Sequence, residues 1–100
     1  DVDVTDNTVN FAGYHGISAY NSTNVLIDGN AVDQSARHGI HGSGIVNLDI
    51  TDNTVDESGE DGINVAYSDY AYINNNGVTN STDDGVSVEY SDGTLVSSNT

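Results

Sequence analysis

The sequence contains no Cys, Pro, Met, Trp or Lys among its 100 residues, and Arg37 is its one strongly basic residue. The absence of Cys excludes disulfide bonds and thiolate metal sites. Sixteen Asp and Glu residues against that single Arg leave a formal net charge of −15. We therefore exclude nucleic acid as a partner, because phosphate contacts need a basic surface, and the same charge disfavours an anionic membrane. No run of about 18 apolar residues occurs, so no membrane-spanning helix is predicted.

Apolar residues make up only 35% of the chain, a composition that by itself would suggest disorder. The residues nevertheless recur at a fixed interval of 23 positions, and this interval marks a repeat protein. A ladder is here a set of similar residues that recur at this interval. Two ladders consist of Asn or Gly: Asn7, Asn30, Asn53, Asn76 and Asn99, and Gly16, Gly39, Gly62 and Gly85. The apolar residues that follow the same interval include Val4, Ile27, Ile50, Ile73 and Val96, and also Ile17, Ile40, Ile63 and Val86.

Within each repeat, apolar and polar residues alternate, as they do at Leu48-Asp49-Ile50 and at Ile63-Asn64-Val65. Alternation is the period of a β-strand, and the spacing typical of an amphipathic helix is missing. Three short strands and three turns close one triangular coil, here called a rung, and rungs stack at about 4.8 Å as parallel sheets. Stacked rungs share a core that one rung cannot form alone. The sequence therefore predicts an all-β fold, a parallel β-helix (β-solenoid) of about 4.3 rungs.

The two polar ladders have structural explanations. Asn tolerates the left-handed backbone conformation that a sharp bend needs, and stacked Asn side chains can form hydrogen bonds along the column. We therefore expect the Asn ladder to lie at a bend, with the Asn residues themselves in that conformation. For the Gly ladder we expect either a positive φ or a close approach of neighbouring atoms.

The segments Ile50–Val55 and Asp61–Val65, with weaker copies in the other rungs, resemble the right-handed parallel β-helix repeat. Pectate lyases, polygalacturonases, alginate epimerases and many surface proteins share this repeat. The resemblance covers the whole chain and implies a right-handed coil. In the enzymes it implies a sugar-binding groove along one sheet, walled by long turn insertions. Every rung here has 23 residues, so we expect no such walls.

We expect the chain to form one β-helix segment, with rungs at about 1–23, 24–46, 47–69 and 70–92 and a partial rung at 93–100. The chain begins without Met and both ends fall within a rung, so the segment is expected to belong to a longer solenoid. An open solenoid end exposes strand edges. Its expected partners are therefore further rungs of the same chain or of identical chains.

One cluster of residues has the composition of a catalytic site. Stacking of rungs places Arg37 and His38 beside Asp61, which lies one rung later, with His41 on the outward face of the adjoining strand. A β-eliminating lyase or an epimerase needs a base and a group that neutralises the uronate carboxylate, and often Ca²⁺. Arg37, His38, His41 and Asp61 would fill these roles. The alternative is that they are solvated surface residues, with Arg37 offsetting Glu60 across a rung.

Acidic residues stacked on successive rungs suggest a second kind of site. Like charges about 5 Å apart repel each other unless they are screened or bridged. Asp61, Asp83 and Asp84 are the candidate ligands for Ca²⁺, which binds carboxylate, amide and carbonyl oxygens. No Asp-x-Asp-x-Asp-Gly loop is present. The alternative is that these carboxylates are simply solvated, so Ca²⁺ is the only cofactor to consider and none is required.

Two functions from different classes fit these observations. The first is a structural segment of an extracellular or cell-surface filament, stalk or adhesin, favoured by the uniform rungs. The second is a fragment of a carbohydrate-active β-helix enzyme, such as a polysaccharide lyase or a uronate epimerase, whose partner would be a polysaccharide. The family resemblance and the cluster of Arg37, His38, His41 and Asp61 favour the second.

Overall fold

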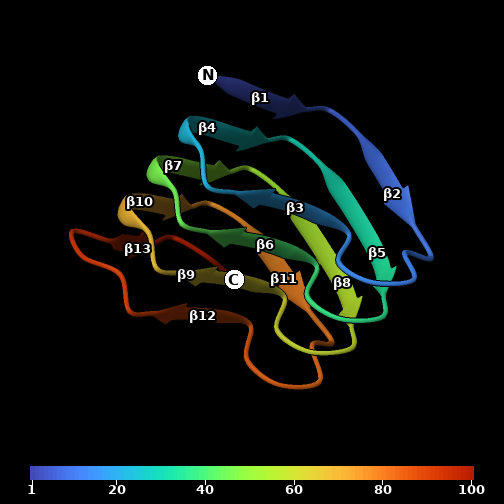
Figure 1. The fold of residues 1–100 in the computed structure, drawn as a ribbon. Helices are drawn as coiled ribbons and strands as arrows, with labels where there is room; N and C mark the ends of the chain where they lie inside the picture. The colour runs from blue at the N-terminus through green and yellow to red at the C-terminus, as the bar shows by residue number, and fades with distance from the viewer.

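The computed structural model describes all 100 residues and contains thirteen β-strands and no helix (Figure 1). The strands form three parallel sheets. Sheet A consists of β1 (Val2–Thr5), β4 (Thr23–Asp28), β7 (Val46–Thr51), β10 (Asp69–Asn74) and β13 (Leu95–Ser97). Sheet B consists of β2 (Thr8–Asn10), β5 (Ala31–Ser35), β8 (Thr54–Ser58) and β11 (Gly77–Thr79). Sheet C consists of β3 (Ile17–Tyr20), β6 (Ile40–Ser43), β9 (Ile63–Ala66) and β12 (Val86–Glu89).

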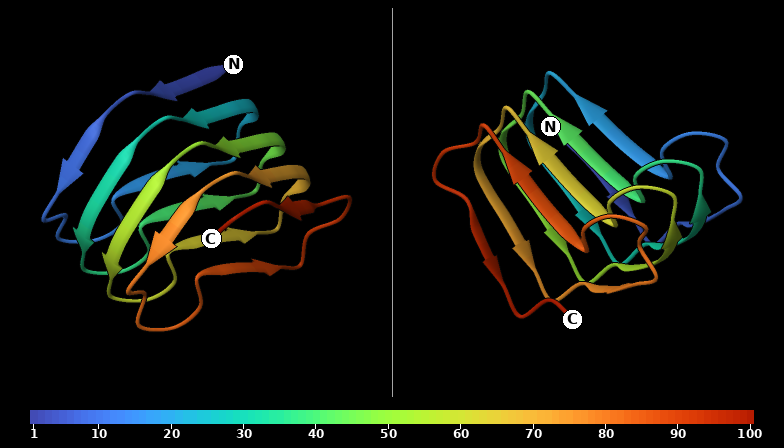
Figure 2. Two further views of the ribbon diagram at one scale, coloured as in Figure 1. Left: turned by 180° about the vertical axis from the view of Figure 1, so that it is seen from behind. Right: turned by 90° about the horizontal axis from the view of Figure 1, so that it is seen from below.

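The register of every sheet equals the sequence repeat. Ile27 pairs with Ile50 in sheet A, and Ile50 pairs with Ile73, each one rung further along. Figure 2 shows the result from two further sides: the chain coils through sheets A, B and C in turn, and each coil lies directly beside the one before it. The predicted all-β parallel solenoid is therefore confirmed.

The core fills the centre of the coil and is made by the apolar ladders. The side chains of Ile27, Ile50 and Ile73 are fully buried, as are those of Ile40 and Ile63. Burying a side chain of this size contributes about 1.5–3 kcal/mol relative to leaving it in water. Identical β-branched side chains meet on successive rungs, so a chain that is only 35% apolar still forms one continuous core.

Every residue with a positive φ belongs to one of four columns, which lie at corners of the coil or near the ends of strands. The columns repeat at the interval of 23 residues and comprise Asp6, Gly29, Asp52, Asn75 and Ser98; Phe11, Gln34, Glu57 and Asn80; Asn21, Gly44, Tyr67 and Tyr90; and Asn24, Asn47, Tyr70 and Gly93. Most of these residues carry a side chain, although the left-handed conformation costs an ordinary L-residue about 1–2 kcal/mol. Ten of the seventeen are Gly, Asn or Asp, which tolerate this conformation, whereas residues such as Phe11, Gln34 and Tyr67 are held in it by the stacked rungs.

The Asn ladder does lie at a bend, between sheets A and B, but one part of the prediction is wrong. The left-handed residue at that bend is the one before each Asn, for example Asp52 with a φ of 54° before Asn53. The Asn side chains instead point inward, where Asn30, Asn53 and Asn76 are each 1% exposed. Each donates to the side-chain oxygen of the next Asn along the solenoid, so the predicted hydrogen bonds along the column are confirmed.

The Gly ladder is explained by close approach and not by a positive φ. A Cβ atom on Gly39 would overlap Cγ1 of Val55 and would lie 2.7 Å from the carbonyl oxygen of Gly62 and 2.8 Å from Oγ of Ser58. Gly16 and Gly62 meet the equivalent atoms of the rungs that follow them, whereas Gly85 has only an ordinary contact with Val78. Before β3, β6 and β9 the backbone therefore passes so close to the following rung that only Gly fits there.

The molecule measures 29 × 23 × 23 Å along its principal axes. None of its segments is a helix with the length and apolar character needed to cross a membrane.

Candidate functional site

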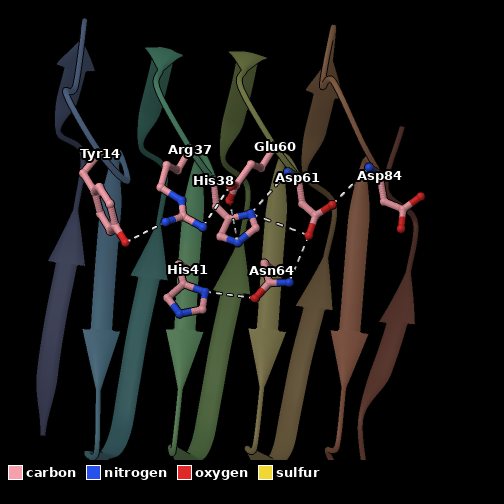
Figure 3. A network of polar contacts seen from close by, with 8 residues as sticks. All are labelled: Tyr14, Arg37, His38, His41, Glu60, Asp61, Asn64 and Asp84. Atoms are coloured by element: carbon pink, nitrogen blue, oxygen red, sulfur yellow. Dashed lines mark hydrogen bonds and ion pairs between the residues drawn. The ribbon is translucent and has the colours of Figure 1, made fainter.

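The predicted cluster forms on the turns that lead into sheet C and on the outward face of that sheet (Figure 3). Main-chain hydrogen bonds link Tyr14 to Arg37 and Arg37 to Glu60, so these residues occupy one column on successive rungs. Arg37, His38 and Asp61 lie side by side, and His41 projects from β6 beside Asn64 of β9. The structure thus brings together all four residues that the sequence suggested for catalysis.

The guanidinium of Arg37 is already bound within the protein. It lies 2.9 Å from Oε1 of Glu60, donates to the hydroxyl of Tyr14 at 2.8 Å, and is positioned over the Tyr14 ring. The hydrogen bond from Arg37 lowers the pKa of Glu60, and the same bond raises the pKa of Arg37. The chain's one strong cation is therefore neutralised by a neighbouring rung, and no other Lys or Arg is present to meet an anionic ligand.

His38 lies between two carboxylates, and its hydrogen bonds define which ring nitrogen carries the proton. Its Nδ1 accepts the main-chain N–H of Asp61 at 3.2 Å, so the hydrogen of a neutral ring must be on Nε2. Nε2 lies 3.2 Å from Oε2 of Glu60. Both ring nitrogens of His38 therefore face groups of the next rung.

Asp61 is only 8% exposed because its carboxylate is surrounded by donors. Oδ1 accepts the main-chain N–H of Asp84 at 3.0 Å, and Oδ2 accepts Nδ2 of Asn64 at 2.9 Å. Nδ1 of His38 lies 3.5 Å from Oδ2. A carboxylate held in this way has a structural part, because it joins its own rung to the following one.

His41 is the member of the cluster with a free ring nitrogen. Asn64 uses its amide N–H on Asp61, so its carbonyl oxygen faces Nδ1 of His41 at 2.9 Å, and Nδ1 must donate. Nε2 of His41 therefore carries a lone pair and has no hydrogen-bond partner in the structure. Burial lowers the pKa of His41 despite the hydrogen bond to Asn64. A neutral imidazole with a free Nε2 can accept a proton from a bound molecule.

The three His residues form an imidazole cluster, defined as His15, His38 and His41. The His15 ring lies 4.6 Å from the His41 ring and 5.1 Å from the His38 ring, and the His38 and His41 rings are 5.2 Å apart. The rings are stacked, with interplanar angles of 3–24°. The sequence placed His15 and His41 in different columns, and only the three-dimensional path of the turn brings them together.

An open depression of about 750 Å³ lies beside the cluster over β9 and β12. Five carboxylates line it, together with His38, His41 and Tyr67, and these acidic residues are Glu60, Asp61, Asp83, Asp84 and Glu89. No insertion walls it, in agreement with the uniform rung length. The surface is therefore shallow, polar and acidic, and uronate polymers would meet repulsion there.

The candidate calcium ligands are close in sequence but do not converge. No group of three or more His, Asp or Glu side chains is arranged to hold a metal ion. Asp61 is engaged with Asn64 and the Asp84 N–H, as described above, whereas the carboxylates of Asp83 and Asp84 are exposed and make no hydrogen bond. Asp83 and Asp84 thus remain single, solvated carboxylates in this structure.

Two further structural features of this region differ in how clearly the sequence indicates them. The stacked rings of Tyr67 and Tyr90, 5.0 Å apart, follow directly from the interval of 23 residues. A second inward ladder at the corner between sheets C and A contains Ser68 and Ser91, each of which accepts a main-chain N–H from the preceding rung. Ile45 interrupts that ladder as a fully buried core residue, so the sequence alone did not reveal it.

Comparison with known proteins agrees with this architecture. A family model described as the right handed beta helix region matches residues 1–100, which is every rung of the chain. No curated protein and no solved structure matches the chain.

Proposed function

The chain belongs to the right-handed β-helix family, and we propose that it is a structural segment of an extracellular or cell-surface solenoid. Its role would be that of a stiff spacer in a filament, stalk or adhesin, in contact with further rungs of the same chain or of identical chains. The same repeat in many surface proteins supports the location. The uniformity of the rungs supports the role.

The single observation that carries this proposal is the uninterrupted set of ladders. Asn7, Asn30, Asn53 and Asn76 are joined by side-chain hydrogen bonds of 2.9–3.0 Å across four rung boundaries, ending at Asn99. The apolar ladders and all three sheets keep the same register throughout. Because each rung contacts only its neighbours in the same way, length can be added without changing the cross-section.

The chemistry of sheet C supports the same proposal. Arg37 is bound to Glu60, and Asp61 is bound to donors of its own and the following rung. These side chains hold adjacent rungs together. This structural role accounts for their arrangement without a bound ligand.

A tandem variant tests the spacer role. Two copies of the chain are joined through a copy of residues 55–69, which supplies the repeat positions between Thr100 and Asp1. We expect small-angle X-ray scattering to show one rod that is about 24 Å longer than the single chain, since five rungs are added at about 4.8 Å each. The control omits the last residue of the linker, which shifts the register by one and turns the apolar residues outward. Two separate compact particles in the in-register variant would refute a continuous spacer.

The location has its own test. An antibody raised against the purified chain should label intact cells of the source. Labelling that requires permeabilised cells would place the protein inside the cell and contradict this part of the proposal.

A second candidate function is supported by one observation, the free Nε2 of His41 above an open depression. In a carbohydrate-active enzyme this nitrogen would take a proton from the sugar, and His38, Arg37 and Asp61 would surround the site. Incubation with pectate, polygalacturonate and alginate tests it through the absorbance of unsaturated uronate. Release of product that is lost in His41→Ala but kept in Ser18→Ala, the equivalent position one rung earlier, would make this the function. No release would leave the spacer as the better explanation.

A further inference from the structure

The imidazole cluster joins two rungs, and few acidic groups are near enough to compensate a positive charge on His15 in the first of them. His15 belongs to the rung of residues 1–23, whereas His38 and His41 belong to the next rung. The stacked rings therefore span the boundary at which β3 pairs with β6. While all three rings are neutral, their contact is an attractive aromatic packing.

The groups around His15 oppose a charge on its ring. From its own turn, Tyr14 contacts the ring edge-on with centroids 4.5 Å apart. From the next rung, His41, His38 and Arg37 disfavour a positive charge on His15. From the sheet, Tyr20 packs against His41. Glu60 is the one acidic group that favours a charged His15, and it is already bound to Arg37.

Nδ1 of His15 is buried and has no hydrogen-bond partner, so a proton there would have no acceptor. Burial, followed by the neighbouring His41 and His38, lowers the pKa of His15 to about 4, and burial also lowers the pKa of His41. In the unfolded chain each ring would titrate near 6.5. Between these two pH values a His15 ring released into solvent binds more protons than the ring packed in the cluster. The contact between the rings therefore weakens as the pH falls from about 6.5 towards 4.

We propose that the imidazole cluster is an acid-sensitive contact, which holds β3 against β6 at neutral pH and lets the two strands separate in mildly acidic surroundings. The loosening is local, because a solenoid opens between individual neighbouring rungs. Hydrogen bonds from Thr79 and Asn80 lower the pKa of Asp56, which pairs with Asp33 of the preceding rung, so the repulsion in that carboxylate column is not relieved in the same pH range. Mild acid thus acts mainly at the rung boundary that the imidazole cluster spans.

Main-chain hydrogen bonds allow each boundary to be measured separately. The N–H groups of Ile17 and Asn21 donate to Gly39 and Ser43, across the boundary with the imidazole cluster. One rung later, the N–H groups of Ile40 and Gly44 donate to Gly62 and Ala66, across a boundary in which the His15 ring takes no part. These two pairs of amides are matched reporters in the same chain.

The test is amide hydrogen exchange followed by NMR at about pH 7.5 and about pH 5, corrected for the intrinsic effect of pH on exchange. We expect the protection of Ile17 and Asn21 to fall by an order of magnitude or more at the lower pH, and that of Ile40 and Gly44 to hold. His15→Asn should remove the difference, since Asn does not titrate. His41→Gln is the second variant and should reduce it.

Two results would overturn the proposal. One is an equal loss of protection at both boundaries, which would indicate general acid destabilisation. The other is a His15 ring that titrates near 6.5 in the intact chain, observed from its own NMR signals without any substitution.

Discussion

Asn53 donates its main-chain N–H and its side-chain amide to one and the same oxygen, Oδ1 of Asn76, at 3.0 and 2.9 Å. The remaining hydrogen of that amide reaches the carbonyl oxygen of Ile27 at 2.9 Å. Asn30 repeats both bonds to Asn53. At a corner where the sheets are interrupted, the side chain thus supplies the acceptor that the main chain lacks.

Replacing Asn53 by Ala should strongly destabilise the protein. The change leaves the main-chain N–H of Asn30 without its acceptor and removes one acceptor of the Asn30 side-chain amide, and a buried unsatisfied group costs about 1–3 kcal/mol. We expect the free energy of unfolding in urea to fall by about 2–4 kcal/mol. Asn10→Ala, at an exposed strand position with no side-chain hydrogen bond, is the control and should change it by less than about 0.5 kcal/mol. Equal losses at both positions would contradict the buried role.

Gly39→Ala tests the close approach at the start of sheet C. The new methyl group would overlap Val55 and lie 2.7 Å from the carbonyl oxygen of Gly62, and backbone cannot move without disturbing two rungs. We expect a loss of about 1–3 kcal/mol in thermal unfolding. Gly13→Ala is the matched control, because no heavy atom lies within 4 Å of a Cβ there. A Gly39→Ala chain as stable as Gly13→Ala would show that the rungs spread freely.

The left-handed columns should reverse the usual ranking of Ala and Gly. Gln34 is exposed and has a φ of 57°, so Gln34→Gly should be more stable than Gln34→Ala by about 1 kcal/mol. At the neighbouring Asp33, in the same strand β5 but without a positive φ, the ordinary strand order should hold, with Asp33→Ala more stable than Asp33→Gly by about 0.5–1 kcal/mol. Chemical denaturation of the four variants measures both differences. The same order at both positions would exclude a conformational cause.

Two Asp residues one rung apart should respond oppositely to loss of their charge. Asp61 accepts hydrogen bonds from Asn64 and from the N–H of Asp84, so Asp61→Asn should lower the melting temperature. Asp84 has an exposed carboxylate without a partner, so Asp84→Asn should raise it at low salt, by relieving repulsion that is on the order of 1 kcal/mol per close pair in water. Shifts of the same sign in both variants would refute this assignment.

The net charge of −15 predicts a dependence on salt. Charges within a Debye length, about 10 Å at 0.1 M, repel less as salt increases. We expect the melting temperature of the unmodified chain to rise with NaCl, and the gain from Asp84→Asn to shrink. Ca²⁺ at matched ionic strength separates screening from binding: a further rise that Asp84→Asn abolishes would identify a ligand. A melting temperature that is independent of salt would show that the columns repel negligibly.

Much of the fold could be predicted from the sequence, because a solenoid repeats the same structural unit, the rung of 23 residues. A residue and its counterpart 23 positions later occupy the same place, so the apolar ladder of Ile27, Ile50 and Ile73 indicated burial, strand and register at once. The same arithmetic predicted the column that contains Arg37 and Glu60, and it accounts for the stacking of Tyr67 on Tyr90. Such relationships run along the solenoid axis, and the repeat determines them.

Relationships around a single coil were decided by the tertiary structure. Which residue of Asp52-Asn53 takes the left-handed conformation depends on which side chain can reach the core, and the ladder of buried amides selects Asn for the interior. The contact of His15 with His41 depends on the path of the turn into sheet C, because the two residues occupy different columns. The interval of 23 residues determines which residues stack on each other along the solenoid axis. Which residues from different columns come into contact follows only from the angles of the corners, and packing of the whole stack imposes those angles.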